Sequence, residues 1–437
     1  MRHITKQCLS VVGFLLLGST SWANPTITYK TRYGYGSMPT ISSVVSLVSA
    51  MTMAAYGWSG RFPDRKDTLL EDCASESERV RSSASPLTGL KWYDGKALPF
   101  RECNPQAIAN VVSARFPAGS SHWQVYIQDA VSPTNAADFI INQFIRYQSP
   151  VVIPLSGGWG SWATIVEVDA SAIPSGYKLE RARLIDGFTG AIMDMPARTF
   201  NMTYWPLFSY DGAICEPDHD GKHCDDGPYF DSWYNKFIAI HDPPTTATTA
   251  ARSLIPVSYE RAPALVTADQ MSTDLATSRV FEALRLAGRD ASPEVKSLMQ
   301  SGHADPARLV RGRWPSGARH DYYLLAVRSQ DGRVTAFVQL DAEDGSFEQL
   351  TMLAQPIAYN PISAEAAQKL ARTALRPGES LGNVTLAWDP AVSESVTSRP
   401  YLPYYELTVH GRDGTTHEVV RVALDAGALL GRISATP

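Results

Sequence analysis

The C-terminal half of the chain repeats itself, and this repeat constrains the fold more than any other feature of the sequence. Tyr322-Tyr323, Asp331-Gly332 and Gly345 recur as Tyr404-Tyr405, Asp413-Gly414 and Gly427, each time at the same offset along the chain. An offset shared by several pairs indicates two copies of one structural unit. Any fold of this region must therefore build the same unit twice.

Each copy begins with an expected helix, at about 273–287 in the first and 363–375 in the second. A Trp-bearing segment follows, and then a strand, an Asp-Gly turn and another strand. Asp-Gly between alternating apolar runs is the strongest short-range signal for a hairpin. We therefore expect two repeats, 259–357 and 358–437, each a helix packed on an antiparallel sheet.

The region before the repeats is also expected to be α+β, with helices first and a sheet second. The run from Ile41 to Tyr56 is apolar nearly all round, which is typical of a buried helix, and its serines argue against the alternative of a membrane span. A second helix is expected at about 135–148. Three β-branched runs then predict strands: Val151–Leu155, Ala163–Val168 and Lys178–Ile185.

A linker is expected where the composition turns to Pro, Thr and Ala, from Asp242 to Ala251. Such segments separate domains. We therefore place the N-terminal domain at 24–243 and the linker at 244–258.

The segment 1–23 has the order of a secretory signal peptide. Arg2 and Lys6 precede a short apolar run, and Ser21, Trp22 and Ala23 follow it. The run is shorter than the ~20 residues that a membrane span needs. We expect cleavage after Ala23 and a periplasmic or secreted mature chain without a membrane span. The formal net charge of −5 offers no basic surface for nucleic acid.

Four cysteines remain after the signal peptide, an even number in a compartment where thiols oxidise. They are Cys73, Cys103, Cys215 and Cys224. Of the three possible pairings we favour Cys73–Cys103 and Cys215–Cys224. The second pair closes a short local loop, and the first brackets one irregular stretch.

The segment from Cys215 to Asp226 crowds thiols, imidazoles and carboxylates together, which suggests a metal ion. The candidate ligands besides the thiols are His219, His223, Asp218 and Asp220. The adjacent His223 and Cys224 are poorly spaced for zinc, a disulfide would remove both thiolates, and the glutamate of a calcium loop is absent. We expect a disulfide-closed acidic loop, with no metal ion and no cofactor.

Four features of residues 30–210 occur in the order found in bacterial papain-like cysteine peptidases, the group of bacteriocin-leader peptidases and some plant-pathogen effector proteases. The helix ending at Gly57 is similar to the helix that carries the nucleophile. Cys73 and Cys103 resemble the cysteine pair of the effector-type members. Ser156–Trp162 resembles the Gly-Gly-His-aromatic stretch, and Asp186–Gly190 the Asp-Pro-aromatic-x-Gly segment whose Asp orients the catalytic His. The resemblance implies a papain-like domain.

The chain departs from this family at the residues that carry the chemistry. Where the family has Cys, this sequence offers Ser43 or a neighbour, and where it has His, Ser161. Only Asp186 matches, although cysteine catalysis requires a thiolate beside an imidazole. The lone His122 and His241 are more typical of structural histidines. We expect no intact catalytic site; the alternative is a hydrolase with a non-standard Ser43 centre, restrained by the C-terminal region.

The second repeat resembles PepSY-type domains, small helix-plus-sheet modules of exported bacterial proteins and peptidase propeptides. The likeness rests on the helix Ser363–Arg372, the strand Tyr404–Val409, the Asp413-Gly414 turn and the strand Val419–Gly427. It implies binding or restraint of a peptidase or envelope partner, with no chemistry of its own; a pure scaffold is the other interpretation. We therefore expect an exported pseudo-peptidase that binds a peptide or an envelope protein without catalysis.

Overall fold

The computed structural model has a mixed α+β fold in which strands predominate. Its described residues are 26–30, 122–127, 141, 145, 151–154, 162–174, 176–186, 189–204, 236–241, 261–314, 317–389, 399–412, 414–425 and 427–434. Within these ranges no helix has the length and apolar character needed to cross a membrane. The expected linker, 244–258, lies outside them.

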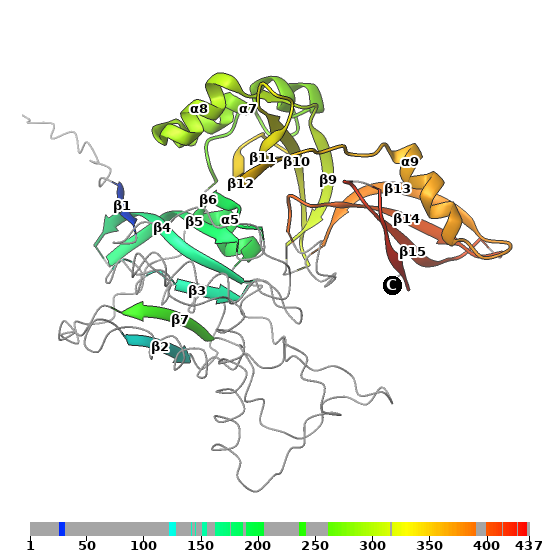
Figure 1. The fold of residues 1–437 in the computed structure, drawn as a ribbon, viewed down its shortest axis with the longest axis horizontal. Helices are drawn as coiled ribbons and strands as arrows, with labels where there is room; N and C mark the ends of the chain where they lie inside the picture. Colours follow the sequence, from blue (N-terminus) through cyan, green and yellow to red (C-terminus); the bar gives the residue numbers. More distant parts are fainter. Residues whose placement is uncertain are drawn as a thin grey trace, which may run out of the picture.

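The described strands join into one 16-stranded sheet (Figure 1). Its order is β16-β15-β14-β13-β9-β10-β11-β12-β6-β5-β4-β3-β7-β2, with β1 on β4 and β8 on β10. The strands are β1 Thr26–Lys30, β2 His122–Ile127, β3 Val151–Pro154, β4 Trp162–Ile173, β5 Gly176–Asp186, β6 Ile192–Pro196, β7 Lys236–His241, β8 His303–Ala304, β9 Arg308–Arg313, β10 Arg319–Arg328, β11 Val334–Asp341, β12 Phe347–Ile357, β13 Ser380–Trp388, β14 Tyr404–His410, β15 Thr416–Ala423 and β16 Leu429–Ser434.

Of the three described helices of the repeats, the first and the last lie where the sequence predicts them, and the middle one is not predicted. The three are α7 Thr273–Leu286, α8 Pro293–Ser301 and α9 Ala364–Ala371, with the 3₁₀ turns η4 Arg289–Ala291 and η5 Arg372–Ala374. Both α7 and α9 begin after a serine, Ser272 and Ser363, whose hydroxyl accepts a hydrogen bond from a backbone N–H of the first helical turn, as is usual for a residue that caps a helix. Two short turns follow β6: α5 Ala197–Thr199 and the π-helical η3 Phe200–Tyr204.

The sequence repeat is confirmed by the strand register. Tyr322 lies opposite Asp341 in the β10–β11 ladder, and Tyr404 lies opposite Ala423 in the β14–β15 ladder. Both ladders carry an irregularity at the same place, before Arg328 and before His410. Each repeat is in fact a four-stranded antiparallel meander, two strands more than the hairpin that the sequence indicates. The two ladders share one register at the offset that the sequence repeat defines.

The last turn of each meander has one geometry, and it also occurs in the N-terminal meander β3–β6. The N–H of Gly345 donates to the Asp341 carbonyl, and the N–H of Gly190 donates to the Asp186 carbonyl. Gly190, Gly345 and Gly427 have φ of 69°, 70° and 61°. These values lie in the left-handed region that favours glycine. Asp186 and Gly190 are therefore hydrogen-bonded across this turn in the same way as Asp341 and Gly345.

The three meanders are joined through their outer strands. β12 pairs with β6 antiparallel, so the first repeat meets the N-terminal meander, and β13 pairs with β9 in parallel, so the two repeats meet. Gly312 lies opposite both His320 and Trp388 at the second junction. A Cβ there would lie 2.4 Å from the His320 carbonyl oxygen, so the close approach of these strands requires glycine.

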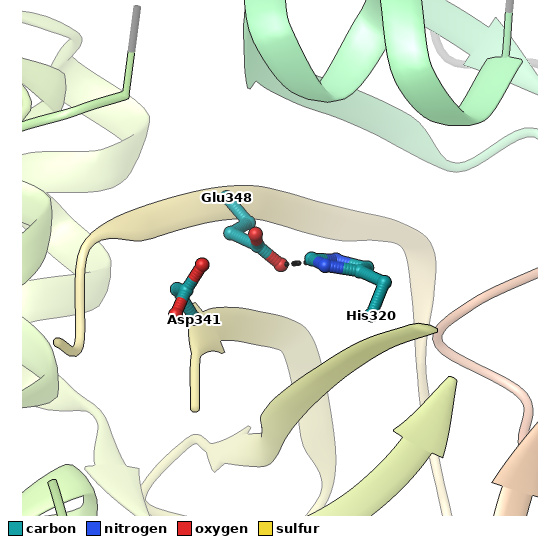
Figure 2. Close-up of side chains that lie close together, drawn as sticks. All are labelled: His320, Asp341 and Glu348. Atoms are coloured by element: carbon teal, nitrogen blue, oxygen red, sulfur yellow. Dashed lines mark hydrogen bonds and ion pairs between the residues drawn. The ribbon is translucent and has the colours of Figure 1, made fainter. Parts of the chain in front are cut away.

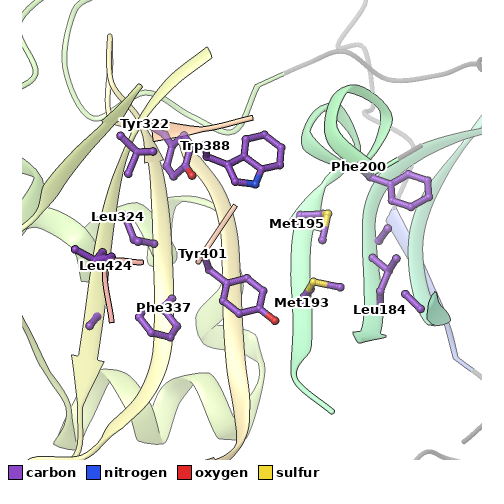
Figure 3. Packing of buried hydrophobic residues seen from close by; sticks show 14 of the residues in the cluster. Leu184, Met193, Met195, Phe200, Tyr322, Leu324, Phe337, Trp388, Tyr401 and Leu424 are labelled. Atoms are coloured by element: carbon purple, nitrogen blue, oxygen red, sulfur yellow. The ribbon is translucent and has the colours of Figure 1, made fainter. Parts of the chain in front are cut away.

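The sheet has a different apolar core on each face. Helices α7 and α8 cover one side of the first repeat, and α9 covers the second repeat (Figure 1). The opposite face of the first repeat packs into a larger core shared with the N-terminal meander and the second repeat. In Figure 3, Tyr401 lies between Met193 of β6 and Phe337 of β11. The rings of Phe337 and Tyr401 are stacked with centroids 5.9 Å apart.

Charged side chains fill the other face of the N-terminal meander. Because successive side chains of a strand point to opposite faces, β5 puts Ala182 and Leu184 in the core, and Arg181 and Arg183 on the opposite side. Asp194 of β6 is 1% exposed and accepts hydrogen bonds from Arg181 Nη1 at 2.7 Å and from Arg183 Nε at 3.1 Å.

Asp194 also binds a residue of the first repeat. Arg289 Nη1, on η4, lies 3.0 Å from Asp194 Oδ1, so the carboxylate links two of the meanders. Burial by itself raises the pKa of Asp194, but Arg181, Arg289 and Arg183 outweigh burial and hold that pKa below its usual value of 3.8. The folded state therefore keeps this carboxylate ionised.

We expect Asp194→Asn to lower the free energy of unfolding by ~3 kcal/mol at pH 7, because it leaves buried guanidinium groups without one carboxylate. A carboxyl whose folded-state pKa is depressed contributes stability above its unfolded pKa and loses it as the pH falls through the folded pKa. The difference between wild type and variant should therefore shrink below about pH 4.

Urea unfolding at pH 7 and pH 3 measures this difference, with Glu180→Gln, a partly exposed carboxylate on the same strand, as the control. A loss of the same size at both pH values would contradict the ionic role of Asp194.

Candidate functional site

Most residues that the sequence singles out lie outside the described part of the chain. These are Ser43, Ser161, Cys73, Cys103, Cys215, Cys224, Asp218, His219, Asp220 and His223. The sites built on them stay predictions, as does the signal peptide. His122 and His241 are opposite each other in the β2–β7 ladder.

Asp186, the expected third member of a triad, ends β5 and is fully buried. It lies opposite Ala163, close after Ser161 in the sequence. The papain-like resemblance assigns its carboxylate to orienting an imidazole. Among the described residues, an arginine and two hydroxyls bind this carboxylate.

Two of the described partners of Asp186, Arg399 and Tyr401, belong to the second repeat. Arg399 binds the carboxylate with both Nε, at Oδ2, and Nη2, which lies 2.6 Å from Oδ1. The hydroxyls of Tyr401 and Thr189 each donate to Oδ2 over 2.9 Å. Arg399 is itself 2% exposed, so this is a buried bidentate ion pair, a strong and directional kind of contact. The arrangement ties the end of β5 to residues far away in the sequence.

A second polar cluster lies inside the first repeat, and the sequence analysis missed it. His320 of β10, Asp341 of β11 and Glu348 of β12 are buried, and one ligand atom of each lies within 4.8 Å of the others (Figure 2). His320 Nε2 and Glu348 Oε2 are 2.9 Å apart. The Trp314 ring stacks on the His320 ring with centroids 3.6 Å apart, which fixes the orientation of the imidazole.

The electrostatics of the cluster are set by its two carboxylates. Burial, followed by the neighbouring Glu348 carboxylate, raises the pKa of Asp341 to about 6. Arg261 and Arg198 approach Asp341 Oδ2 only to 3.4 Å and 3.7 Å. One imidazole and two carboxylates form a donor set that can share a proton or hold a metal ion.

The repeat itself contains the signal that could have found this cluster. The positions equivalent to His320, Asp341 and Glu348 in the second copy hold Leu402, Ala423 and Leu430. Three chemically active side chains thus replace three apolar ones at equivalent positions. Comparing how the copies differ, in addition to how they agree, would have identified them.

Comparisons with known proteins yield little for this chain. No family model matches it, and no curated protein matches it. Among solved structures, the Bacillus megaterium YpeB C-terminal domain is similar at 10% identity, over 71% of this chain and 100% of that chain, with a TM-score of 0.17. A similarity of this size carries no argument about fold or function.

We expect Arg399→Ala to lower the free energy of unfolding by about 3–5 kcal/mol, because it leaves the buried Asp186 carboxylate without its charge partner. The matched control is Arg376→Ala, since that guanidinium is 68% exposed and pairs with Glu418 at 3.7 Å. The control should cost less than about 1 kcal/mol.

Urea unfolding at pH 7 measures both variants, and the double variant Asp186→Ala/Arg399→Ala should recover part of the loss. Equal, small losses in Arg399→Ala and Arg376→Ala would show that the buried pair does not stabilise the fold.

Proposed function

We propose that this chain is an exported bacterial pseudo-peptidase, which binds a peptide or envelope protein without catalysis. Its N-terminal region would be a degenerate papain-like domain, and its C-terminal region a pair of PepSY-like repeats. The observation that supports this best is that Arg399, Tyr401 and Thr189 all donate hydrogen bonds to the Asp186 carboxylate.

The argument against catalysis rests on what a triad carboxylate must do. It accepts a hydrogen bond from an imidazole and stabilises the imidazolium that forms during the reaction. Here Arg399 already neutralises the Asp186 carboxylate, so the carboxylate has little capacity to stabilise a second cation. Serine at positions 43 and 161 supplies neither the thiol nor the base of the family. All three positions therefore favour a domain that has lost the reaction.

The edge of the sheet offers a place for a peptide to bind. β16 ends the strand order, and it pairs only with β15 within the described part of the chain. Leu429 at its start is 46% exposed. An extended segment can add to such an edge through main-chain hydrogen bonds and be held by side-chain contacts. We therefore assign partner binding to β16 in this proposal.

The absence of catalysis is tested with mature chain 24–437 and its Ser43→Ala variant. We expect no hydrolysis of a generic protein substrate and no labelling by a serine-reactive fluorophosphonate in either protein, because the position where the family has its imidazole base holds Ser161. Turnover and labelling that both disappear in the variant would establish a Ser43 hydrolase and reject the pseudo-peptidase.

Partner binding is tested by placing a photo-crosslinking residue at position 429 and, as a control, at position 333, an exposed turn of the first repeat. Irradiation in cells should give a discrete adduct from position 429 and none from position 333, because only the first lies on the terminal strand of the sheet. Identical patterns from both positions would reject β16 as the binding edge.

A further inference from the structure

The cluster of His320, Asp341 and Glu348 comes from three neighbouring strands at one end of the first repeat. Figure 2 shows the three side chains directed toward a common point from β10, β11 and β12. All three are buried, with side chains between 4% and 8% exposed. Because strands fix the position of each Cα, the cluster is held by the scaffold and not by a loop.

We propose that His320, Asp341 and Glu348 form a binding site for a first-row divalent transition-metal ion, with zinc as the preferred ion. The proposed site uses none of the triad-equivalent residues and none of residues 215–226, so it does not rest on the proposed function.

The donor set determines the class of ion. An imidazole nitrogen with two carboxylates is a ligand combination that zinc accepts, at bond lengths of about 2.0–2.2 Å. Calcium and magnesium prefer oxygen ligands alone, so His320 disfavours both. In a tetrahedral zinc site the ligand atoms are about 3.3 Å apart. Zinc binding would separate the His320–Glu348 pair slightly from 2.9 Å, and the remaining separations, at most 4.8 Å, require only a modest inward movement.

The charge of the cluster favours a cation. Asp341 and Glu348 place two carboxylates in a buried site, and a buried charge requires a partner. The guanidinium groups of Arg198 and Arg261 pair with Asp341, at the long distances of 3.7 Å and 3.4 Å. Arg261 is moreover shared with two other carboxylates, those of Glu343 and Asp344. A divalent ion would bind both members of the Asp341–Glu348 pair at once.

The second repeat shows that a meander of this kind forms without the cluster. At the equivalent positions it carries Leu402, Ala423 and Leu430, and it builds the same meander in the same register. Burying polar groups where apolar ones suffice costs stability, so their presence in one copy alone indicates a purpose other than folding. Trp314 stacks on His320 and so restricts the orientation of the imidazole before an ion binds.

The test compares mature chain 24–437 with the variant His320→Leu/Asp341→Ala/Glu348→Leu, which copies the second repeat into the first. Each protein is refolded with Zn²⁺, dialysed, and analysed for bound zinc by mass spectrometry. We expect the wild type to retain one more zinc per chain than the variant. Equal zinc contents in two folded proteins would overturn the proposal.

A second variant keeps the test valid if the triple replacement fails to fold. Glu348→Gln preserves the shape of the side chain and removes one anionic ligand, so zinc affinity should fall by ~100-fold or more. His303→Ala removes an exposed imidazole and should leave the affinity unchanged. Unchanged zinc affinity in Glu348→Gln, with circular dichroism showing a native fold, would also overturn the site.

Cobalt distinguishes this site from the cysteine-containing loop. Co²⁺ bound to nitrogen and oxygen ligands gives visible d–d bands without a thiolate charge-transfer band. We expect those bands in the wild type and their loss in Glu348→Gln. Charge-transfer absorption that persists in the variant would place the ion at the thiols of the loop and reject the proposed site.

Discussion

Main-chain pairing between separate meanders organises this molecule. A four-stranded meander leaves two edges of unpaired N–H and C=O groups, which are costly when buried and prone to aggregation when exposed. Here the N-terminal meander and the first repeat share one junction, β6 with β12, and the two repeats share another, β9 with β13. Each edge strand of the first repeat thereby gains a partner over part of its length. The other contacts between the three regions form around these two junctions.

Buried charge pairs fix how each repeat is placed against the N-terminal meander. Backbone hydrogen bonds alone would tolerate a slipped register, whereas a carboxylate with a fixed guanidinium partner does not. Asp194 binds Arg289 of the first repeat, and Asp186 binds Arg399 of the second. In each pair the carboxylate belongs to the N-terminal meander and the arginine to a repeat. Misplaced pairing would leave these charges buried without partners, so the pairs select one arrangement.

The sequence predicted the local structure of the repeats well, because that structure depends on nearby residues. One helix of each copy and the Asp-Gly hairpin follow from short-range patterns, and the register confirms the repeat. The junctions could not be predicted in this way. Asp186 and Arg399 are 213 residues apart, and no periodicity relates them. The His320 cluster escaped detection for a similar reason, since its three residues become neighbours only when β10, β11 and β12 align.

The short motif that begins at Asp186 is compatible with two different roles: orienting a catalytic His and closing a hairpin turn. A carboxylate followed by an aromatic residue and glycine resembles the segment that orients a catalytic His, and this likeness led the sequence analysis to a triad. The same spacing, from Asp186 to Gly190, is also that of Asp341 to Gly345, where the glycine adopts a positive φ to close a hairpin. Because the turn requires its glycine whether or not chemistry occurs, the glycine says nothing about catalysis. The partners of the carboxylate are more informative, and for Asp186 those among the described residues include an arginine and two hydroxyls.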